Sequence, residues 1–386
     1  MGLSLSYRQN IITQSEIRNM TRECKLAGGI NLAQGVCDTD IVPQVKEGAK
    51  RAIDGGINSY TRYDGLPELR EAISIKHEKR TGMKTDPETQ VVVSAGTTGV
   101  FYAAALALLN PGDEVIVFEP FYSYHISTLQ AVDVKPVYVR MHLPDWSIDP
   151  AEIRSKMTSR TRGIIINTPA NPSGKIFSLT ELQMLGEIAR EYDIFIFTDE
   201  IYEDFVYDGH RHIAPVTAGD LAQRTITISG FSKIFSITGW RIGYCICDPK
   251  WADAIGQIND LVYVCAPAPL QAGVTDALNE LDENYYRDVA KKYQKRRDFF
   301  CNTLKNAGFE PHVPQGAYYV LTNLEKVPGK TSKEKAMAFL KATGVAGVPG
   351  EAFYHDGSGK SLIRFCFAKD DTVLEEVARR IKAVHY

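Results

Sequence analysis

The sequence predicts an α/β fold: a mostly parallel, seven-stranded sheet flanked by helices, with a smaller α+β domain. Between residues 90 and 250, short β-branched runs alternate with longer segments of helical period. These runs are apolar on both faces, which is typical of parallel strands that helices cover on both sides. The chain has 386 residues, more than the roughly 100–200 of one typical domain, so a second unit is expected.

The expected elements follow in chain order. Seven runs predict the strands, which cover residues 90–94, 114–119, 134–139, 162–167, 194–199, 225–229 and 241–247. Leu179 to Glu191 is amphipathic and predicts a helix between two of them. After about residue 280 a long charged helical stretch (283–306), the runs YYVLTN and LIRFCF, and a last helix (371–384) predict the α+β domain. We expect a large domain over 45–280 and a small domain built from 1–44 and 281–386.

Composition excludes several classes of protein. The 44 Lys and Arg against 47 Asp and Glu give a net charge of −3 with no polybasic patch, so we expect no nucleic-acid partner. The longest apolar stretch, around residues 102–109, is far shorter than the roughly 18 residues of a membrane span. We also find no secretory signal pattern at the N-terminus. Seven cysteines without a paired C-x-x-C unit favour a reduced, cytoplasmic protein.

One turn has the composition of a phosphate site. The run 90–94 continues into Ala95-Gly96-Thr97-Thr98-Gly99 and then into a good helix former. Free backbone N–H groups and the helix dipole at such a turn attract anions. Taken alone, the segment is better explained as an ordinary strand-to-helix turn.

Polar side chains follow three consecutive expected strands, at the sheet edge where open α/β sheets bind ligands. They are Asn167 and Asn171, Asp199 and Tyr202, and Lys233 and Arg241. Each alone is explained by a structural role, but together they predict a cofactor site. We expect no metal there, and we expect His210 and His212, in the loop DGHRH, to be surface residues.

Six motifs in order carry a family resemblance over about residues 30 to 370. They are YTRYDGLPELREAI from Tyr60, AGTT (95–98), NTPANPSGK (167–175), DEIYE (199–203), SKIFSITGWRIGY (232–244) and RFCFA (364–368). The set closely resembles the pyridoxal-phosphate-dependent class I/II aminotransferases of the aspartate aminotransferase superfamily (fold type I). The resemblance implies that the cofactor is pyridoxal 5'-phosphate.

The resemblance also implies roles for single residues. Lys233 is implied as the lysine that binds the cofactor aldehyde, and Asp199 as the partner of the pyridine nitrogen. Tyr202 and Asn171 are implied as donors to the phenolic oxygen, and Tyr122 as the ring that stacks on the cofactor. Catalysis is thus expected from Lys233, Asp199 and Tyr202.

Further residues are implied to hold the phosphate and the substrate. Arg241, Gly96, Thr97 and Thr98 match the phosphate site, and Tyr60 matches a tyrosine that reaches the phosphate of a neighbouring subunit, which implies a homodimer with shared sites. Ser232 is a further candidate, because Gly230 stands where many relatives carry a phosphate-binding serine. Arg364 matches the arginine for the substrate α-carboxylate, with Asn171 and Gly35 beside it. After Gly35, Cys37 occupies a position that is often proline.

The implied reaction is amino-group exchange between an L-amino acid and a 2-oxo acid, by a ping-pong mechanism between pyridoxal and pyridoxamine phosphate. One alternative is a C–S lyase or an aminocyclopropane-carboxylate-synthase-like enzyme on the same fold, since fold does not fix reaction type. Another is a non-catalytic regulatory or binding module, which retention of Lys233, Asp199, Arg241 and Arg364 disfavours.

The expected donor is neutral, either aromatic or large aliphatic. No Lys or Arg occurs in 91–134 or in 261–273, so the second carboxylate of a dicarboxylic substrate lacks a cationic partner there. Tyr102, Phe121, Tyr122 and Tyr263 are the aromatic residues expected to form the wall. Arg18, Arg22 and Lys25 leave open a cation from the N-terminal segment, and 2-oxoglutarate or another small oxo acid is the expected acceptor.

Overall fold

The computed structural model describes residues 3–12 and 14–384 and contains the seven-stranded sheet expected from the sequence. Its strands are β2 (Val91–Ala95), β3 (Glu114–Glu119), β4 (Lys135–Arg140), β5 (Thr161–Asn167), β6 (Phe195–Asp199), β7 (Thr225–Gly230) and β8 (Ile242–Ile246), in the order β2-β8-β7-β6-β5-β3-β4. Neighbours from β4 to β7 are parallel, whereas β8 is antiparallel to both β7 and β2. The predicted α/β fold class is therefore confirmed.

Helices cover both faces of this sheet because its strands are apolar on both sides. In β5, Ile164 and Ile166 pack into one core with α8 (Leu179–Glu191), and Ile165 packs into another with α5 (Gly96–Leu108). Side chains of α6 (Ser123–Ala131) and α9 (Pro249–Tyr263) complete the second core. A third core, at the β2–β8 edge, includes side chains of α3 (Pro43–Asp54), α4 (Pro67–Thr81) and α10 (Ala268–Glu280). Short α7 (Pro150–Lys156) contacts β4.

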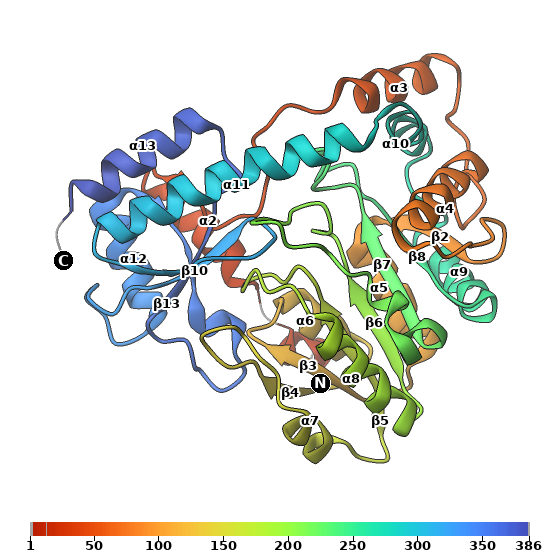
Figure 1. The fold of residues 1–386 in the computed structure, drawn as a ribbon, viewed down its shortest axis with the longest axis horizontal. Helices are drawn as coiled ribbons and strands as arrows, with labels where there is room; N and C mark the ends of the chain where they lie inside the picture. Colours follow the sequence, from red (N-terminus) through yellow and green to blue (C-terminus); the bar gives the residue numbers. More distant parts are fainter. Residues whose placement is uncertain (1–2, 13, 385–386) are drawn as a thin grey trace.

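A smaller sheet lies beside the large one (Figure 1). It is antiparallel, in the order β12 (Val348–Pro349), β13 (Leu362–Cys366), β10 (Tyr319–Asn323) and β9 (Glu310–His312). Next to it, β1 (Ile30–Asn31) pairs in parallel with β11 (Val345–Ala346). The accompanying helices are α2 (Glu16–Leu26), α11 (Glu283–Asn306), α12 (Ser332–Thr343) and α13 (Asp371–Lys382).

The N-terminal segment touches both parts of the molecule. Helix α2 contacts β1, β11 and β12 beside the small sheet, whereas α1 (Arg8–Ile11) contacts α6 on the large one. The long α11 runs across the top of the view, from α10 to α13 (Figure 1). The remaining short helices are the 3-10 turns η1 (Pro215–Thr217), η2 (Gly219–Gln223) and η3 (Gly350–Phe353). We propose the division expected from the sequence, 45–280 against 1–44 plus 281–386, as the two domains.

Among the described residues, no helix is both long enough and apolar enough to cross a membrane. The polar groups expected at the sheet edge do end up together. Asn167 and Asp199 are register partners at the ends of β5 and β6, and β7 ends beside them. The chain leaves β7 into the loop that contains Lys233. This edge of the large sheet therefore positions the candidate site.

Candidate active site

A cavity of about 490 Å³ lies between the edge of the large sheet, the first turn of α2 and the small sheet. Most of the residues proposed from the sequence line it together. They are Gly35, Thr97, Thr98, Tyr122, Asn171, Asp199, Tyr202, Ser232, Lys233, Arg241 and Arg364. Residues as far apart in the chain as Gly35 and Arg364 therefore converge on one space.

Lys233 faces this cavity from a loop that large side chains fix. Phe231 and Phe235, on either side of it, are fully buried and stack on each other. The Lys233 Nζ donates to the carbonyl of Gly35 at 3.2 Å, and no carboxylate of the described chain lies within ion-pair distance of it. Burial lowers the pKa of the Lys233 amine, because desolvation disfavours its charged form. The amine is thus poised as a nucleophile.

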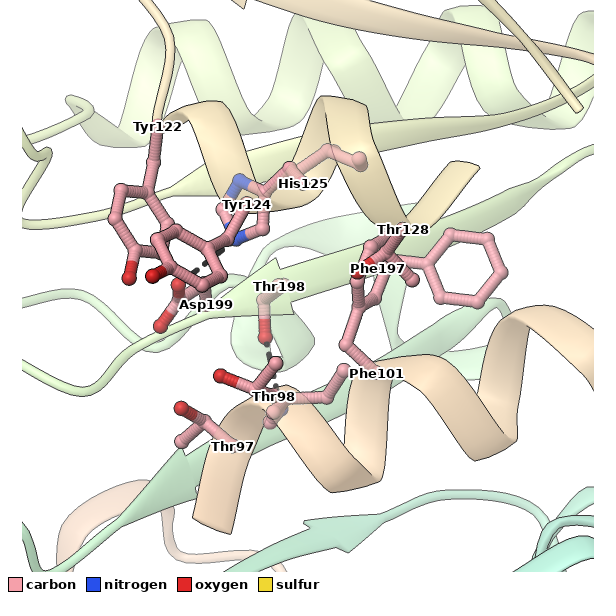
Figure 2. A pocket seen from close by; sticks show the side chains of 12 residues that line it. Thr97, Thr98, Phe101, Tyr122, Tyr124, His125, Thr128, Phe197, Thr198 and Asp199 are labelled. Carbon is pink, nitrogen blue, oxygen red and sulfur yellow. Dashed lines mark hydrogen bonds and ion pairs between the residues drawn. The ribbon is translucent and has the colours of Figure 1, made fainter. Parts of the chain in front are cut away.

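Asp199 is supported by a histidine that the sequence reasoning missed. His125, on α6, lies 2.9 Å from the carboxylate through its Nε2 and is itself buried. Its ring packs edge-on against Tyr122, three residues earlier (Figure 2). His125 follows Tyr122, the N-cap of the short helix α6, by three residues, and this spacing was the available signal. The contact holds the Asp199 carboxylate toward the cavity.

Two tyrosines of the cavity wall are hydrogen-bonded to each other, and a third packs against both. The hydroxyls of Tyr202 and Tyr319 lie 2.9 Å apart, and Tyr318 donates to the Gly35 carbonyl at 3.2 Å. Burial raises the pKa of the Tyr202 phenol well above its ordinary value, so this group stays protonated and can donate. Tyr319 was not proposed from the sequence, and the run YYVLTN gave no sign that its second residue faces a site.

The start of α5 forms a cradle with Arg241. Ala95, the residue before the helix, gives no side-chain cap, so the first backbone N–H groups remain free beside Thr97 and Thr98. Gly96 has φ +76, and a Cβ there would lie 2.4 Å from Nη2 of Arg241. Arg241 donates to the carbonyl of Thr238 at 3.0 Å. Glycine is therefore required both by conformation and by the approach of the guanidinium.

Arg364 is fully buried in β13, yet part of its guanidinium has no protein partner. Its Nη1 donates to Oδ1 of Asn171 at 2.9 Å, and its Nη2 donates to the carbonyl of Ala33. The Nε has no hydrogen-bond partner in the described structure. The Tyr319 ring lies 4.3 Å from the guanidinium carbon. A buried cation without a carboxylate partner fits a site for an anionic ligand.

Two departures from the family pattern have a clear physical basis. A Cβ at Gly230 would lie 3.0 Å from the Gly243 Cα and 3.2 Å from the Thr97 side chain, so a serine does not fit without movement. Ser232 lines the cavity instead. At the position that is often proline, Cys37 is buried, and its thiol donates to the Lys233 carbonyl at 3.7 Å. Cys37 thereby ties the Gly35 loop to the lysine loop.

Some expected residues lie elsewhere. Tyr60 is 83% exposed and does not line the cavity of its own chain. Of the four aromatic residues expected in the wall, only Tyr122 lines it. Phe121 is buried against Tyr138, and Tyr263 lies against α5 near Gly99. The expectation for Tyr102, Phe121 and Tyr263 was wrong; Tyr124 and Tyr319 line the cavity with Tyr122.

His212 is not the surface residue expected from its loop. Its side chain is only 9% exposed, and its Nε2 lies 2.7 Å from Glu200, a residue that follows Asp199. Glu203 completes a close group of possible metal ligands. However, the Glu203 carboxylate already binds Lys76 and, at 3.0 Å, Arg80. The group is therefore a charge-compensated cluster, which spacing along the chain could not reveal.

Comparisons with known proteins agree with this geometry. Residues 27–381 match the family described as aminotransferase class I and II. A probable N-succinyldiaminopimelate aminotransferase of Mycobacterium tuberculosis is 33% identical, over 92% of each chain. The aromatic-amino-acid aminotransferase 2 of Thermococcus litoralis is 31% identical, over 99% of this chain and 98% of its own. The structure of an Escherichia coli protein with a methionine aminotransferase function superposes with a TM-score of 0.95 at 27% identity, covering 99% of this chain and 100% of its own. The chain thus belongs to the class I and II aminotransferase family and is an aminotransferase.

Proposed function

We propose that the cavity binds pyridoxal 5'-phosphate and transfers the amino group of a neutral L-amino acid to a 2-oxo acid. The observation that carries the proposal is the Lys233 amine, which is desolvated, unpaired with any acid of the described chain, and open to the same cavity as Asp199 and Arg241. When bound, the cofactor supplies an aldehyde that exchanges amines and a ring that accepts the electrons of the substrate Cα–H bond.

The residues around the cavity fit this cofactor. The N-terminus of α5, the hydroxyls of Thr97 and Thr98, and Arg241 together offer the donors that a phosphate dianion needs. Ser232 is a further hydroxyl donor on this side. In the same cavity, the carboxylate of Asp199, held by His125, can keep a ring nitrogen protonated. The cavity therefore offers donors for a phosphate together with a carboxylate for a basic ring nitrogen.

Other side chains orient groups and move protons. We assign the Tyr202 phenol and the Asn171 amide as donors to an oxygen on the ring, because both face the cavity and the phenol stays protonated. Tyr122, which also lines the cavity, is assigned to cover one face of the ring. The Lys233 amine, with its lowered pKa, can take the proton from the substrate Cα and return it to the neighbouring carbon.

Arg364 is assigned to the substrate α-carboxylate. Its planar guanidinium fixes a carboxylate by two parallel hydrogen bonds, and this fixes which bond at Cα stands perpendicular to the ring. The Gly35 carbonyl, which accepts from both Lys233 and Tyr318, shapes the same side of the cavity. A Cβ at Gly35 would lie 1.8 Å from the Tyr319 hydroxyl, so no side chain fits there.

The preference for a neutral donor rests on the cations present. Lys233, Arg241 and Arg364 each have an assigned partner. Arg18, the other cation that lines the cavity, is exposed, and the rest of the wall includes Tyr122, Tyr124, Tyr319, Val36 and Ile17. A carboxylate in the donor side chain would be desolvated where it packs on these tyrosine and aliphatic groups, which costs several kcal/mol, and a solvent-exposed cation offsets little of that cost. Large aliphatic and aromatic side chains gain from the same contact.

We propose a homodimer with composite sites and a cytoplasmic location. An exposed apolar patch supports the dimer: Tyr60 and Leu261 are each more than 80% exposed. The two lie on neighbouring segments, because Asn259 Nδ2 donates to the Tyr63 carbonyl at 2.6 Å. In such a dimer Tyr60 would contribute to the site of the partner subunit, which explains why its side chain is exposed in a single chain. All seven cysteines are free, as in proteins of a reducing compartment.

Single amino acids test the proposal without a second substrate. The protein loaded with pyridoxal phosphate is mixed with phenylalanine, methionine, leucine or aspartate, and the conversion of its cofactor to pyridoxamine phosphate is followed by absorbance. We expect conversion with the neutral amino acids, with kcat/KM at least tenfold above that for aspartate. Preference for aspartate would contradict the proposed donor class, and absence of conversion with every amino acid would contradict the proposed reaction at this site.

A further inference from the structure

The segment 199–204 separates two cavities. Asp199 and Tyr202, which have assigned roles, line the active-site cavity. A second cavity of about 420 Å³ lies on the other side of the segment, between it, helix α4 and the start of α11. Three acids of the segment line this second cavity: Glu200, Glu203 and Asp204. The reaction described above uses none of these acids.

Cations of α4 bind two of the acids. Glu203 pairs with Lys76 and, at 3.0 Å, with Arg80, which also pairs with Asp204. The side chains of Lys76 and Glu203 are only 10% and 11% exposed. Burial alone would raise the pKa of Glu203, but Arg80 and Lys76 hold this pKa well below its ordinary value. Glu203 is therefore ionised and held to α4 by two cations. We call Lys76, Arg80, Glu203 and Asp204 the rear ion cluster.

Tyr202 lies in a turn that few backbone hydrogen bonds hold. Strand β6 ends at Asp199, and the residues that follow it up to the end of the segment belong to no helix or strand. Within the turn, Glu203 N donates to the Glu200 carbonyl at 2.9 Å, and Phe205 N donates to the Tyr202 carbonyl at 2.8 Å. Asp199 is held differently, because β5 and β7 pair with it on both sides. The sheet thus fixes Asp199 but does not fix Tyr202.

The rear ion cluster supplies the constraint that the backbone lacks. Tyr202 and Glu203 are consecutive residues whose side chains line different cavities. A movement of the turn that displaces the phenol therefore also pulls the Glu203 carboxylate away from Lys76 and Arg80. Separating a buried charge from its partners is strongly unfavourable. The cluster thereby restricts the turn, and with it the phenol, to one position.

We propose that Glu203, through the rear ion cluster, is a positioning residue that keeps the Tyr202 phenol within hydrogen-bonding reach of the cofactor ring. This inference rests on the proposed function, in which that phenol donates to an oxygen on the ring. A hydrogen bond weakens steeply when the donor leaves the favourable distance and angle, so a small movement of the turn is enough to lose it. Stability alone does not account for the cluster, because an apolar pair often replaces a buried ion pair without loss of stability.

A paired substitution separates positioning from stability. Lys76→Met and Glu203→Leu together remove one positive and one negative charge and leave the Arg80–Asp204 pair in place. Glu203→Leu alone leaves Lys76 buried without its partner, so we expect a lower urea midpoint for the cofactor-free protein. The double variant is expected to recover most of this loss. Glu283→Gln is the matched control, because it removes an exposed charge that lines the same second cavity.

The absorbance of bound pyridoxal phosphate, followed as a function of pH, reports on the phenol. A donor to the ring oxygen stabilises its negative charge, so loss of the donor moves the midpoint of the absorbance change to higher pH. Tyr202→Phe, which removes the hydroxyl, is expected to raise the midpoint by about one pH unit. The double variant is expected to raise it at least half as far, since its net charge is unchanged and only the position of the phenol differs.

Two further variants sharpen the test. Adding the paired substitution to Tyr202→Phe is expected to cause no further shift, because the cluster acts through the phenol. Glu203→Gln keeps the shape of the side chain and one acceptor oxygen, so its midpoint is expected to lie between those of the wild type and the double variant. The control Glu283→Gln is expected to titrate as the wild type does.

The outcomes separate this inference from the proposed function. An unchanged midpoint in Tyr202→Phe would contradict the role proposed for Tyr202 itself, and the inference would fall with it. A shift in Tyr202→Phe together with an unchanged midpoint in both the double variant and Glu203→Gln would overturn the inference alone. An additional shift when the paired substitution is combined with Tyr202→Phe would also overturn it, because the cluster would then act on the cofactor by a route other than the phenol.

Discussion

Replacing Gly96 by alanine tests the cradle at the start of α5. Gly96 has φ +76, and its Cβ would lie 2.4 Å from Nη2 and 2.7 Å from Cζ of Arg241. Gly82 is the matched control, because it has φ +72 but nothing within 4 Å of its Cβ position. Both alanine variants carry the same left-handed strain, and only Gly96→Ala also displaces the guanidinium.

The difference between the two variants follows from these contacts. Left-handed backbone costs alanine roughly 1–2 kcal/mol at either position, which cancels in the comparison. Displacing Arg241 removes its hydrogen bond to the Thr238 carbonyl at 3.0 Å. It also moves the guanidinium away from the position where we propose that it binds the phosphate. A hydrogen bond to a charged group contributes about 2 kcal/mol. This corresponds to a loss of about 30-fold in affinity for a phosphorylated ligand.

The assay compares pyridoxal phosphate with pyridoxal, which lacks the phosphate. Their dissociation constants are measured for wild type, Gly96→Ala and Gly82→Ala, together with urea unfolding of the cofactor-free proteins. We expect Gly96→Ala to weaken pyridoxal phosphate binding by tenfold to a hundredfold and to change pyridoxal binding much less. A value within twofold of that for Gly82→Ala would refute the assignment of Gly96 and Arg241 to the phosphate.

Three further substitutions follow from the same geometry. His125→Leu removes the 2.9 Å contact to Asp199, and should cost about 1–3 kcal/mol in urea unfolding and slow the half-reaction with phenylalanine at least fivefold; an unchanged rate would limit His125 to packing. Burial lowers the Lys233 pKa below its ordinary 10.5. At pH values between the lowered pKa of the folded protein and 10.5, the unfolded chain therefore holds a proton that the folded chain lacks. The stability of the cofactor-free protein should therefore rise with pH on the alkaline side, up to pH 10.5, more steeply in wild type than in Lys233→Ala, and equal slopes over that range would mean that the amine is not desolvated. Finally, refolding Lys233→Ala together with Tyr60→Ala should restore activity through mixed dimers with one intact site; verified mixed dimers without activity would count against a shared site.

The strands of the large sheet could be predicted because the apolar pattern that buries each strand lies within a few consecutive residues. Runs such as RGIIIN are apolar on both faces, and Ile164, Ile165 and Ile166 do pack alternately into two cores. The same reasoning brought Asn167, Asp199 and Lys233 to one edge, since parallel strands end there together. The very short strands, such as β1 and β11, left no periodic pattern to detect, because each has two residues.

The parts of the site that were missed depend on contacts between distant segments. Tyr319 and Tyr202 meet only when the small sheet lies against the edge of the large one. The wrong wall, with Tyr102, Phe121 and Tyr263, came from two segments without Lys or Arg, 91–134 and 261–273, whose aromatic residues were expected to face the substrate. Which side of α5 and which side of β3 these rings occupy is decided by packing on α9 and on Tyr138. His212 was misplaced for the same reason, since its partner Glu200 comes from another loop.

The residue to which pyridoxal 5'-phosphate attaches tests the central proposal most directly. The protein is reconstituted with pyridoxal 5'-phosphate, reduced with borohydride to make any lysine attachment permanent, digested, and sequenced by mass spectrometry. Lys233 is the lysine that lines the cavity of the described structure, and its amine is desolvated without an acidic partner, so we predict a phosphopyridoxyl group on Lys233 in nearly every molecule. A modified lysine elsewhere in a protein that still transfers amino groups, with Lys233 unmodified, would contradict it.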